Sequence, residues 1–251
     1  MRKHLVMIAI ITAALVPYSL TWAAEGEEEE PLWVGSVGMS YLSTSGNSDT
    51  TSFGLDFNAK RRPTPWGYEF FGLFSRAEDE GELTAERYYG GAKGLRSLGE
   101  KWSLFTAATG EKDRFAGFDL RTVLSAGATY TAVANDRVTL AIDGGLTYTN
   151  EDLYVEEGTL DDDSNSFMGA VLGLNFGWQF SENAKLTQLL TYFPNFDESS
   201  DWRLESVTAV EAALTDLFAL RVSYDVRYRN EPLLGTDDTD TTTKASLVMK
   251  F

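Results

Sequence analysis

The twelve residues at the C-terminal end of the chain, Asp240–Phe251, alternate between two kinds of side chain. Successive residues of a β-strand point to opposite faces, so this alternation predicts a strand with one apolar face and one mostly polar face. A strand that exposes such a face and ends on an aromatic residue is unusual in a soluble protein and typical of the last strand of a membrane-spanning β-barrel. The apolar face carries Ala245, Leu247, Met249 and Phe251.

The same period of two recurs along the chain in segments of ten to fifteen residues, each followed by a turn or a polar loop. This spacing favours an all-β fold of antiparallel strands. We expect twelve strands, an even number that places both ends of a bacterial barrel on the same side of the membrane. The expected strands are residues 33–43, 51–61, 66–76, 86–96, 101–111, 118–131, 137–149, 166–180, 185–194, 202–214, 217–229 and 240–251.

The alternation is clearest in residues 217–229, where one face carries only aromatic and aliphatic side chains. The opposite face carries three arginines, Arg221, Arg227 and Arg229. This pattern suits a strand with lipid on one side and a wet lumen on the other, and it predicts a transmembrane, antiparallel up-and-down β-barrel of twelve strands. Residues 51–61, 166–180 and 202–214 repeat the pattern, whereas the faces of residues 101–111 and 185–194 are ambiguous.

The connections between the expected strands alternate in length and charge. Those after even-numbered strands are short, such as Asn135-Asp136 and Thr215-Asp216, and those after odd-numbered strands are longer or more acidic. Outer-membrane barrels have short periplasmic turns and longer outer loops, so the alternation places the chain ends in the periplasm. The carboxylates of the outer loops are expected to be solvated beside lipopolysaccharide, and specific Ca²⁺ or Mg²⁺ binding is a second interpretation. The acidic outer loops are expected at Glu78–Glu82, Asp161–Asp163 and Asp237–Asp240.

The first 23 residues have the layout of a cleaved secretory signal peptide, with Arg2 and Lys3 before an apolar run and Ala23 at the cleavage point. The apolar run is shorter than the ~20 residues of a spanning helix, which disfavours the alternative of an N-terminal membrane anchor. No later run is long enough for such a helix. Lipid cannot satisfy an open sheet edge, so the barrel is expected to be closed. Residues 24–32 are expected to be an acidic, flexible leader, and residues 33–251 to form the barrel.

Composition excludes several classes of function. The chain has 38 Asp and Glu residues against 21 Lys and Arg residues, an acidic balance that excludes nucleic acid as a partner. It has no Cys, and its one histidine, His4, lies in the expected signal peptide. An outer-membrane serine hydrolase of twelve strands would need a histidine to activate its serine, so we expect no enzyme. We also assign no cofactor and no metal site.

Charged residues at alternate strand positions are expected to line the lumen, and basic residues outnumber acidic ones among them. In a first interpretation these charges pair across strands and cover the interior wall with salt bridges. In a second, neighbouring arginines leave a positive track that suits small anions. The expected lumen-lining charges are Asp56, Lys60, Glu69, Arg87, Lys93, Arg121, Asp143, Arg203, Glu205, Glu211, Arg221, Asp225, Arg227, Arg229, Lys244 and Lys250.

The segment after the first expected strand, Leu42–Thr50, carries Ser45, Gly46 and Asn47. It resembles the Thr-Ser-Gly-Asn-Thr/Ser stretch of the YdiY-like family of salt-induced outer-membrane proteins. Gly and Asn tolerate positive φ, so we interpret the motif as a tight turn. The resemblance implies an outer-membrane location and an association with salt or envelope stress, and it implies no reaction.

These observations predict a monomeric barrel in the outer membrane of a Gram-negative bacterium, in contact with outer-membrane lipids and lipopolysaccharide. Two functions stay open, and an outer-membrane hydrolase is the least favoured third. The first is a structural or stress-related envelope protein with a narrow or plugged lumen, and the second is a narrow porin-like channel for small anionic solutes. By its resemblance to the last residue of other outer-membrane barrels, Phe251 is expected to be the signal read by the barrel assembly machinery.

Overall fold

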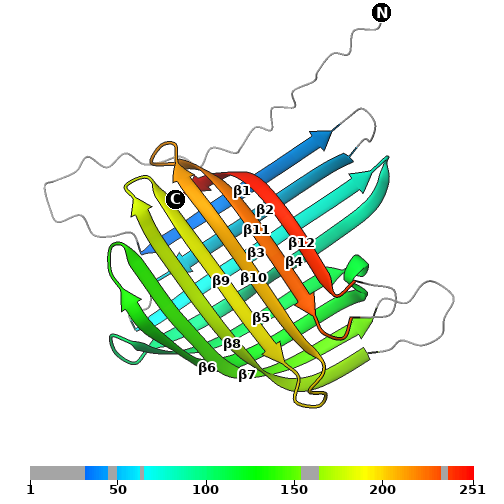
Figure 1. The fold of residues 1–251 in the computed structure, drawn as a ribbon. Coiled ribbons are helices and arrows are strands. Elements are labelled where there is room, and N and C mark those ends of the chain that lie inside the picture. Colours follow the sequence, from blue (N-terminus) through cyan, green and yellow to red (C-terminus); the bar gives the residue numbers. More distant parts are fainter. Residues whose placement is uncertain (1–31, 45–49, 63–64, 154–163, 233–236) are drawn as a thin grey trace, which may run out of the picture. The chain divides into compact units, whose positions relative to one another are not determined.

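The computed structural model describes residues 32–44, 50–62, 65–153, 164–232 and 237–251. The predicted signal peptide, all of the predicted leader except Leu32, and the turn at Ser45, Gly46 and Asn47 lie outside these residues. Leu32–Phe251 form one structural unit built of β-strands (Figure 1). No helix in the described part of the chain is long and apolar enough to cross a membrane.

The described residues contain twelve strands and one turn of 3₁₀ helix, η1 (Arg114–Ala116), between the fifth and sixth strands. Several strands run two to four residues further than predicted, mostly toward the end of the barrel away from Phe251. The strands are β1 (Trp33–Thr44), β2 (Thr50–Arg61), β3 (Trp66–Asp79), β4 (Glu82–Ser97), β5 (Trp102–Asp113), β6 (Phe118–Ala134), β7 (Val138–Leu153), β8 (Ser164–Ser181), β9 (Ala184–Pro194), β10 (Trp202–Ala213), β11 (Phe218–Arg229) and β12 (Thr239–Lys250).

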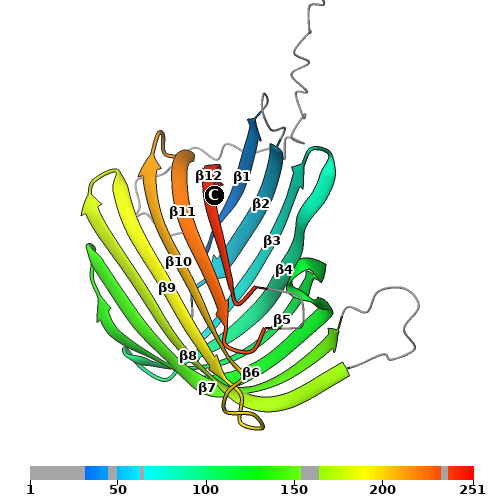
Figure 2. The same ribbon diagram turned by 45° about the vertical axis from the view of Figure 1, so that its right-hand side comes forward.

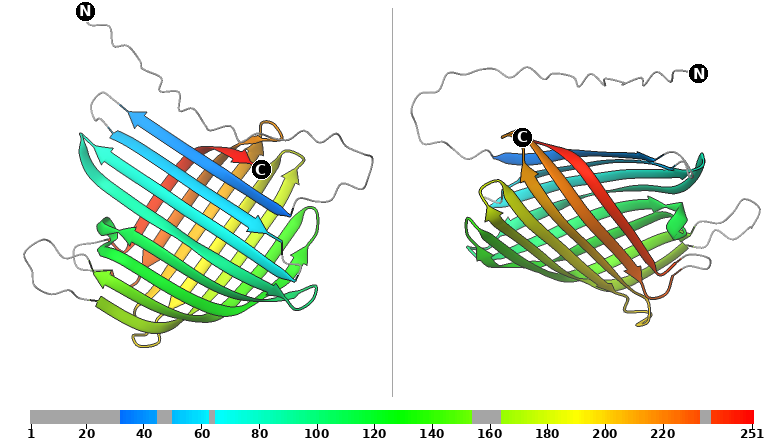
Figure 3. Two further views of the ribbon diagram at one scale, coloured as in Figure 1. Left: turned by 180° about the vertical axis from the view of Figure 1, so that it is seen from behind. Right: turned by 45° about the horizontal axis from the view of Figure 1, so that its top comes forward.

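Each strand pairs antiparallel with the strands before and after it, and β1 pairs with β12 to close the sheet. The predicted closed barrel of twelve antiparallel strands is therefore confirmed. Figures 2 and 3 show the tilted strands winding around the interior. The start of β1 and the end of β12 lie at one end of the barrel, which is called the inner end below, and the opposite end is called the outer end.

Side chains of turn residues stabilise the short connections at the inner end. The Asn135 carboxamide oxygen accepts hydrogen bonds from the backbone N–H groups of Arg137 and Val138, at 3.0 and 2.8 Å. The Thr215 hydroxyl oxygen accepts one from the Phe218 N–H at 2.9 Å. Asn and Thr side chains thus replace the ladder bonds that the chain loses where it reverses.

The connection between β3 and β4 differs from the prediction of an acidic outer loop at Glu78–Glu82. The two strands continue to Asp79 and restart at Glu82, so the loop is a two-residue turn. Glu80 and Gly81 both have positive φ, 52° and 85°, as the tight turns that suit twisted hairpins require. The loop prediction was wrong because it counted acidic residues as loop-forming and overlooked that Gly81 suits the second position of a two-residue hairpin turn.

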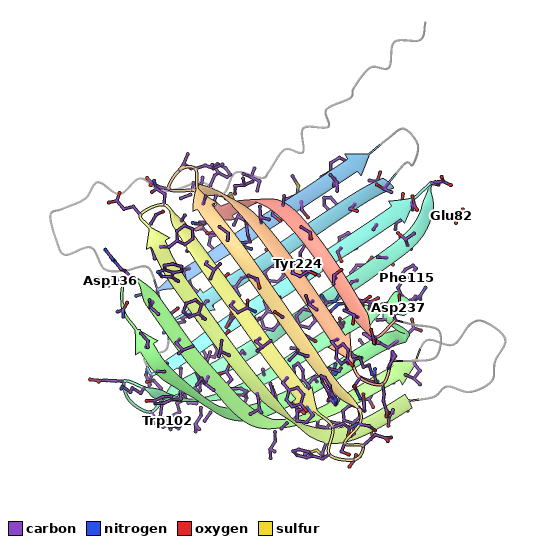
Figure 4. All side chains as sticks on the ribbon, in the orientation of Figure 1. Glu82, Trp102, Phe115, Asp136, Tyr224 and Asp237 are labelled. Atoms are coloured by element: carbon purple, nitrogen blue, oxygen red, sulfur yellow. The ribbon has the colours of Figure 1, made fainter. Side chains whose placement is uncertain are left out.

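The outer surface of the barrel exposes apolar side chains from every strand. On β11, Leu220, Val222 and Tyr224 are each about half exposed, and Tyr224 is labelled on the barrel wall in Figure 4. A soluble protein rarely exposes a contiguous apolar surface of this extent, whereas lipid stabilises it. The outer surface is therefore the lipid-facing surface.

Aromatic side chains contact one another near both ends of the barrel. At the outer end, the Trp202 ring lies 5.6 Å from the Tyr192 ring and 4.9 Å from the Tyr228 ring, measured between centroids. At the inner end, Trp102 and Tyr130 lie 4.9 Å apart. Such rings, partly apolar and partly polar, form the girdles of membrane barrels at the two interfaces.

The seam between β1 and β12 has the shortest ladder in the described wall. Residues Ser36–Ser40 pair with Ser246–Lys250, five residue pairs against twelve between β1 and β2. Phe251 extends the seam, because it and Gly35 exchange two backbone hydrogen bonds of 2.8 and 3.0 Å. The Phe251 ring occupies the space that a side chain at position 35 would need, since a Cβ there would lie 2.4 Å from the ring.

Candidate functional site: the charged barrel interior

The inward faces of the strands carry the buried charges of the barrel. Alternate strand positions point inward, so an apolar outer surface and a charged interior come from the same segments. The buried charged residues are Glu111, Asp113, Arg121, Asp143, Glu151, Asp201, Arg203 and Glu211.

An ion-pair cluster around Glu211 lies in the inner half of the barrel. One oxygen of the buried Glu211 carboxylate lies 2.9 Å from the Lys250 ammonium and 3.2 Å from that of Lys185. The other oxygen lies 2.9 Å from the guanidinium of Arg221. Arg221 also reaches Asp56 on β2 at 3.2 Å, so this cluster links β9, β10, β11, β12 and β2.

A second cluster surrounds Glu111 in the outer half. Its carboxylate lies 2.6 Å from Arg87, 3.3 Å from Arg227 and 3.5 Å from Arg121. Arg227 also contacts Asp113 at 2.9 Å. Three guanidinium groups therefore share one buried carboxylate, an arrangement in which loss of the carboxylate leaves several charges without compensation.

Glu151 is the most completely buried carboxylate described, with 1% of its surface exposed. It lies 2.6 Å from Arg121 and 3.2 Å from Arg229. Arg229 contacts Asp201 as well, also at 3.2 Å. Through Arg121, this group joins the Glu111 cluster into one network of alternating charges.

Some of these ion pairs join opposite walls of the barrel. β5 and β11 are six positions apart in the ring of twelve strands, so the contacts of Arg227 with Glu111 and Asp113 cross the interior. Lys93 of β4 reaches Asp143 of β7 at 3.2 Å, three positions away. The hydroxyl of Thr129 donates a further hydrogen bond to Asp143.

The structure places the predicted lumen charges in this interior, and most of them have a partner. Arg121, Arg221, Arg227 and Arg229 each form ion pairs, and Lys244 lies 2.5 Å from Asp225. These contacts favour the first interpretation, an interior wall of salt bridges, over a positive track. Arg203 and Glu205, two of the predicted residues, line one cavity, and their side chains form no hydrogen bond or ion pair within the described residues.

Sequence reasoning missed several interior charges, and they change the charge balance. The expected excess of basic residues in the lumen becomes much smaller, because buried acidic residues offset most of it. Glu151 continues the inward-facing row of Thr147 and Thr149, so the alternation could have predicted that it faces the lumen. The pattern around Glu111 is ambiguous and could not have predicted this. The missed residues are Glu111, Asp113, Glu151, Lys185 and Asp201.

The acidic segments do not combine into a metal site within the described residues. No group of three or more His, Cys, Asp or Glu side chains there is placed to hold a metal ion. The predicted loop at Asp161–Asp163 lies outside these residues. The chemistry that the interior supports is charge pairing and the binding of charged groups.

Comparison with known proteins identifies relatives over nearly the whole barrel. Residues 37–251 match the model of a family described as "Protein of unknown function, DUF481". The chain is 25% identical over 228 residues to the "Uncharacterized protein YdiY" of Escherichia coli (strain K12), covering 90% of this chain and 86% of that one.

Two solved structures match this chain over most of its length. The translocator domain of the autotransporter NalP from Neisseria meningitidis matches with a TM-score of 0.50 and 11% identity, covering 90% of each chain. A NanC porin structure matches with a TM-score of 0.47 and 10% identity, covering 86% of this chain and 97% of that one. At these identities the NalP match shows the barrel fold and nothing of the function.

Proposed function

The chain belongs to the family described as "Protein of unknown function, DUF481", and from that premise we propose that this outer-membrane β-barrel is closed to solutes by the ion pairs of its interior. It serves the envelope of a Gram-negative bacterium as a structural, stress-associated protein and catalyses no reaction. It reaches the outer membrane after cleavage of its signal peptide and lies there as a monomer among lipids and lipopolysaccharide.

The observation that carries this proposal is the set of ion pairs from β11 to β5. Arg227 reaches Glu111 and Asp113 across the interior, and Asp240 of β12 adds a further contact at 3.3 Å. A solute that crosses the barrel has to separate these charges, and the buried carboxylates of Glu111 and Asp113 then lose a partner. The alternative of a narrow anion channel has less support, because Arg221, Arg227 and Arg229 are already paired with carboxylates.

Planar-bilayer recordings test the closed interior. The wild-type protein is expected to show no conductance above the baseline of the membrane. Arg227→Ala removes the group that joins the two walls and is expected to produce discrete conductance steps. Arg96→Ala is the matched control, since Arg96 stacks on the Trp66 ring at the inner end and belongs to no interior ion pair described. Anion-selective wild-type conductance that falls with Arg221→Glu would instead establish the channel.

The association with salt stress is supported by the resemblance to the YdiY-like family. We expect the amount of the protein in outer-membrane fractions to rise several-fold after cells are moved to high NaCl. Quantitative mass spectrometry of these fractions measures the change, with an unrelated barrel as the reference. An unchanged amount of the protein at high NaCl would contradict the association with salt stress and would not affect the proposal that the barrel is closed.

A further inference from the structure

The charges at the outer end of the interior are unequally satisfied. Arg121, Arg227 and Arg229 each use their guanidinium groups in ion pairs with buried carboxylates. Arg203 and Glu205 follow one another on the inward face of β10, and their side chains form no ion pair or hydrogen bond within the described residues. A buried charge without a partner is costly, so the buried Arg203, with the half-buried Glu205 beside it, stands out from the network around it.

Arg203 is 93% buried and is held by an aromatic ring. Its guanidinium carbon lies 4.9 Å from the centre of the Phe193 ring, while 7% of the residue surface stays accessible. Stacking covers a face of a guanidinium group and leaves its N–H groups free at the edge. These donors face a cavity and have the planar geometry that suits a carboxylate.

This cavity has a volume of about 280 Å³ and is lined by both Arg203 and Glu205. Phe115 of η1 and Asp237, both labelled at the outer end in Figure 4, also line it. The size is close to the lower limit of roughly 300 Å³ for small-molecule sites. Arg227 and Arg229 also line the cavity, and both already form ion pairs, although the Nη1 atom of Arg229 is buried without a hydrogen-bond partner among the described residues.

We infer that this cavity binds a small zwitterion from the outer side, with its carboxylate on Arg203 and its cationic group on Glu205. The two residues are one pleat repeat apart on one strand face, about 7 Å between equivalent atoms, so one short molecule can reach both. A simple anion would satisfy Arg203 and leave Glu205 without a partner. It would also be repelled by Asp237 and Asp238 in the cavity lining.

This site adds a binding function to the proposed closed barrel. Binding at the site does not depend on whether solutes pass through the barrel. The ion pairs from β11 to β5 form part of its surroundings, so a bound ligand stays at the outer end if the interior is closed. Binding and conductance are therefore separate measurements, and either result can fail while the other stands.

Isothermal titration of the folded full-length protein in detergent tests the inference with three matched probes. 4-Aminobutyrate carries both charges, butyrate carries the carboxylate alone and butylammonium carries the cation alone. The wild-type protein is expected to bind 4-aminobutyrate with saturation and at least about tenfold more tightly than either single-charge probe, the ratio expected for one lost charge-assisted contact. Arg203→Gln is expected to weaken 4-aminobutyrate binding by at least about tenfold for the same reason.

Glu205→Gln gives the sharper readout, because it removes only the contact to the amine. This variant is expected to bind 4-aminobutyrate and butyrate about equally. Arg221→Gln is the control, since Arg221 lies in the Glu211 cluster and not in this cavity. Heat-modifiable migration on gels verifies that each variant is folded. Absence of saturable binding, equal wild-type binding of butyrate, or unchanged selectivity in Glu205→Gln would each overturn the inference.

Discussion

Replacing Glu111 with alanine is expected to destabilise the barrel by roughly 3–5 kcal/mol, the range for breaking a buried ion pair by removing one partner. Glu111 is 5% exposed and lies within 3.5 Å of Arg87, Arg121 and Arg227. Its loss leaves three guanidinium groups with fewer partners around a buried position. Arg121 and Arg227 retain Glu151 and Asp113, whereas no other ion pair is described for Arg87.

Denaturant unfolding in lipid vesicles, followed by tryptophan fluorescence, measures this effect. Glu82→Ala is the matched control, because Glu82 is an exposed residue at the outer end (Figure 4) and forms no ion pair in the described part of the chain. Its free energy of unfolding is expected to stay within about 0.5 kcal/mol of the wild type. If the two variants unfold at the same denaturant concentration, the Glu111 cluster does not stabilise the barrel.

Deleting Phe251 is expected to lower the amount of protein in the outer membrane several-fold, as losses of 1–2 kcal/mol commonly do. The deletion removes two backbone hydrogen bonds to Gly35, each contributing about 1 kcal/mol, and the ring that fills the space beside Gly35. We further propose that it removes the residue read by the assembly machinery, which makes assembly more sensitive than stability.

Quantitative immunoblots of outer-membrane fractions measure the result. Phe218→Ala is the control, because Phe218 is an exposed aromatic residue at the inner end whose strand pairs with β12. Phe251→Ala separates the two roles of the residue, since it keeps the hydrogen bonds to Gly35 and removes the ring. A normal level of the deletion variant in the outer membrane would show that Phe251 is neither an assembly signal nor a needed part of the seam.

Local sequence pattern predicted the wall of the barrel well, because the alternation of apolar and polar residues within each strand shows which residues face lipid and which face the lumen. In β11 and β12 most of the residues assigned to lipid are exposed, and Val248, on the opposite face from Phe251, is fully buried. The hairpin at Glu80–Gly81 was missed because composition was weighed above turn geometry. The pattern could not predict how far β7 continues past Thr149, since the loop and the strand there are both polar.

The interior contacts lay beyond sequence reasoning for a different reason. Arg227 and Asp113 are 114 residues apart in the chain, and the sequence around one residue gives no indication of its contact with the other. Their meeting depends on which strands oppose each other and on the stagger of the sheet, and strand number alone does not set that stagger. The unpaired state of Arg203 and Glu205 has the same origin, because it depends on what every other interior charge contacts.

The short ladder at the seam has a consequence for how the barrel comes apart. A closed ring of strands loses its closure at the interface with the fewest hydrogen bonds, and amide hydrogens exchange with solvent where local opening costs least. Pairing between β1 and β12 covers five residue pairs, so the interface between these two strands is expected to be the least stable in the described barrel. β1 and β12 can pair only after the strands between them have been synthesised. They are thus also expected to be the first to separate.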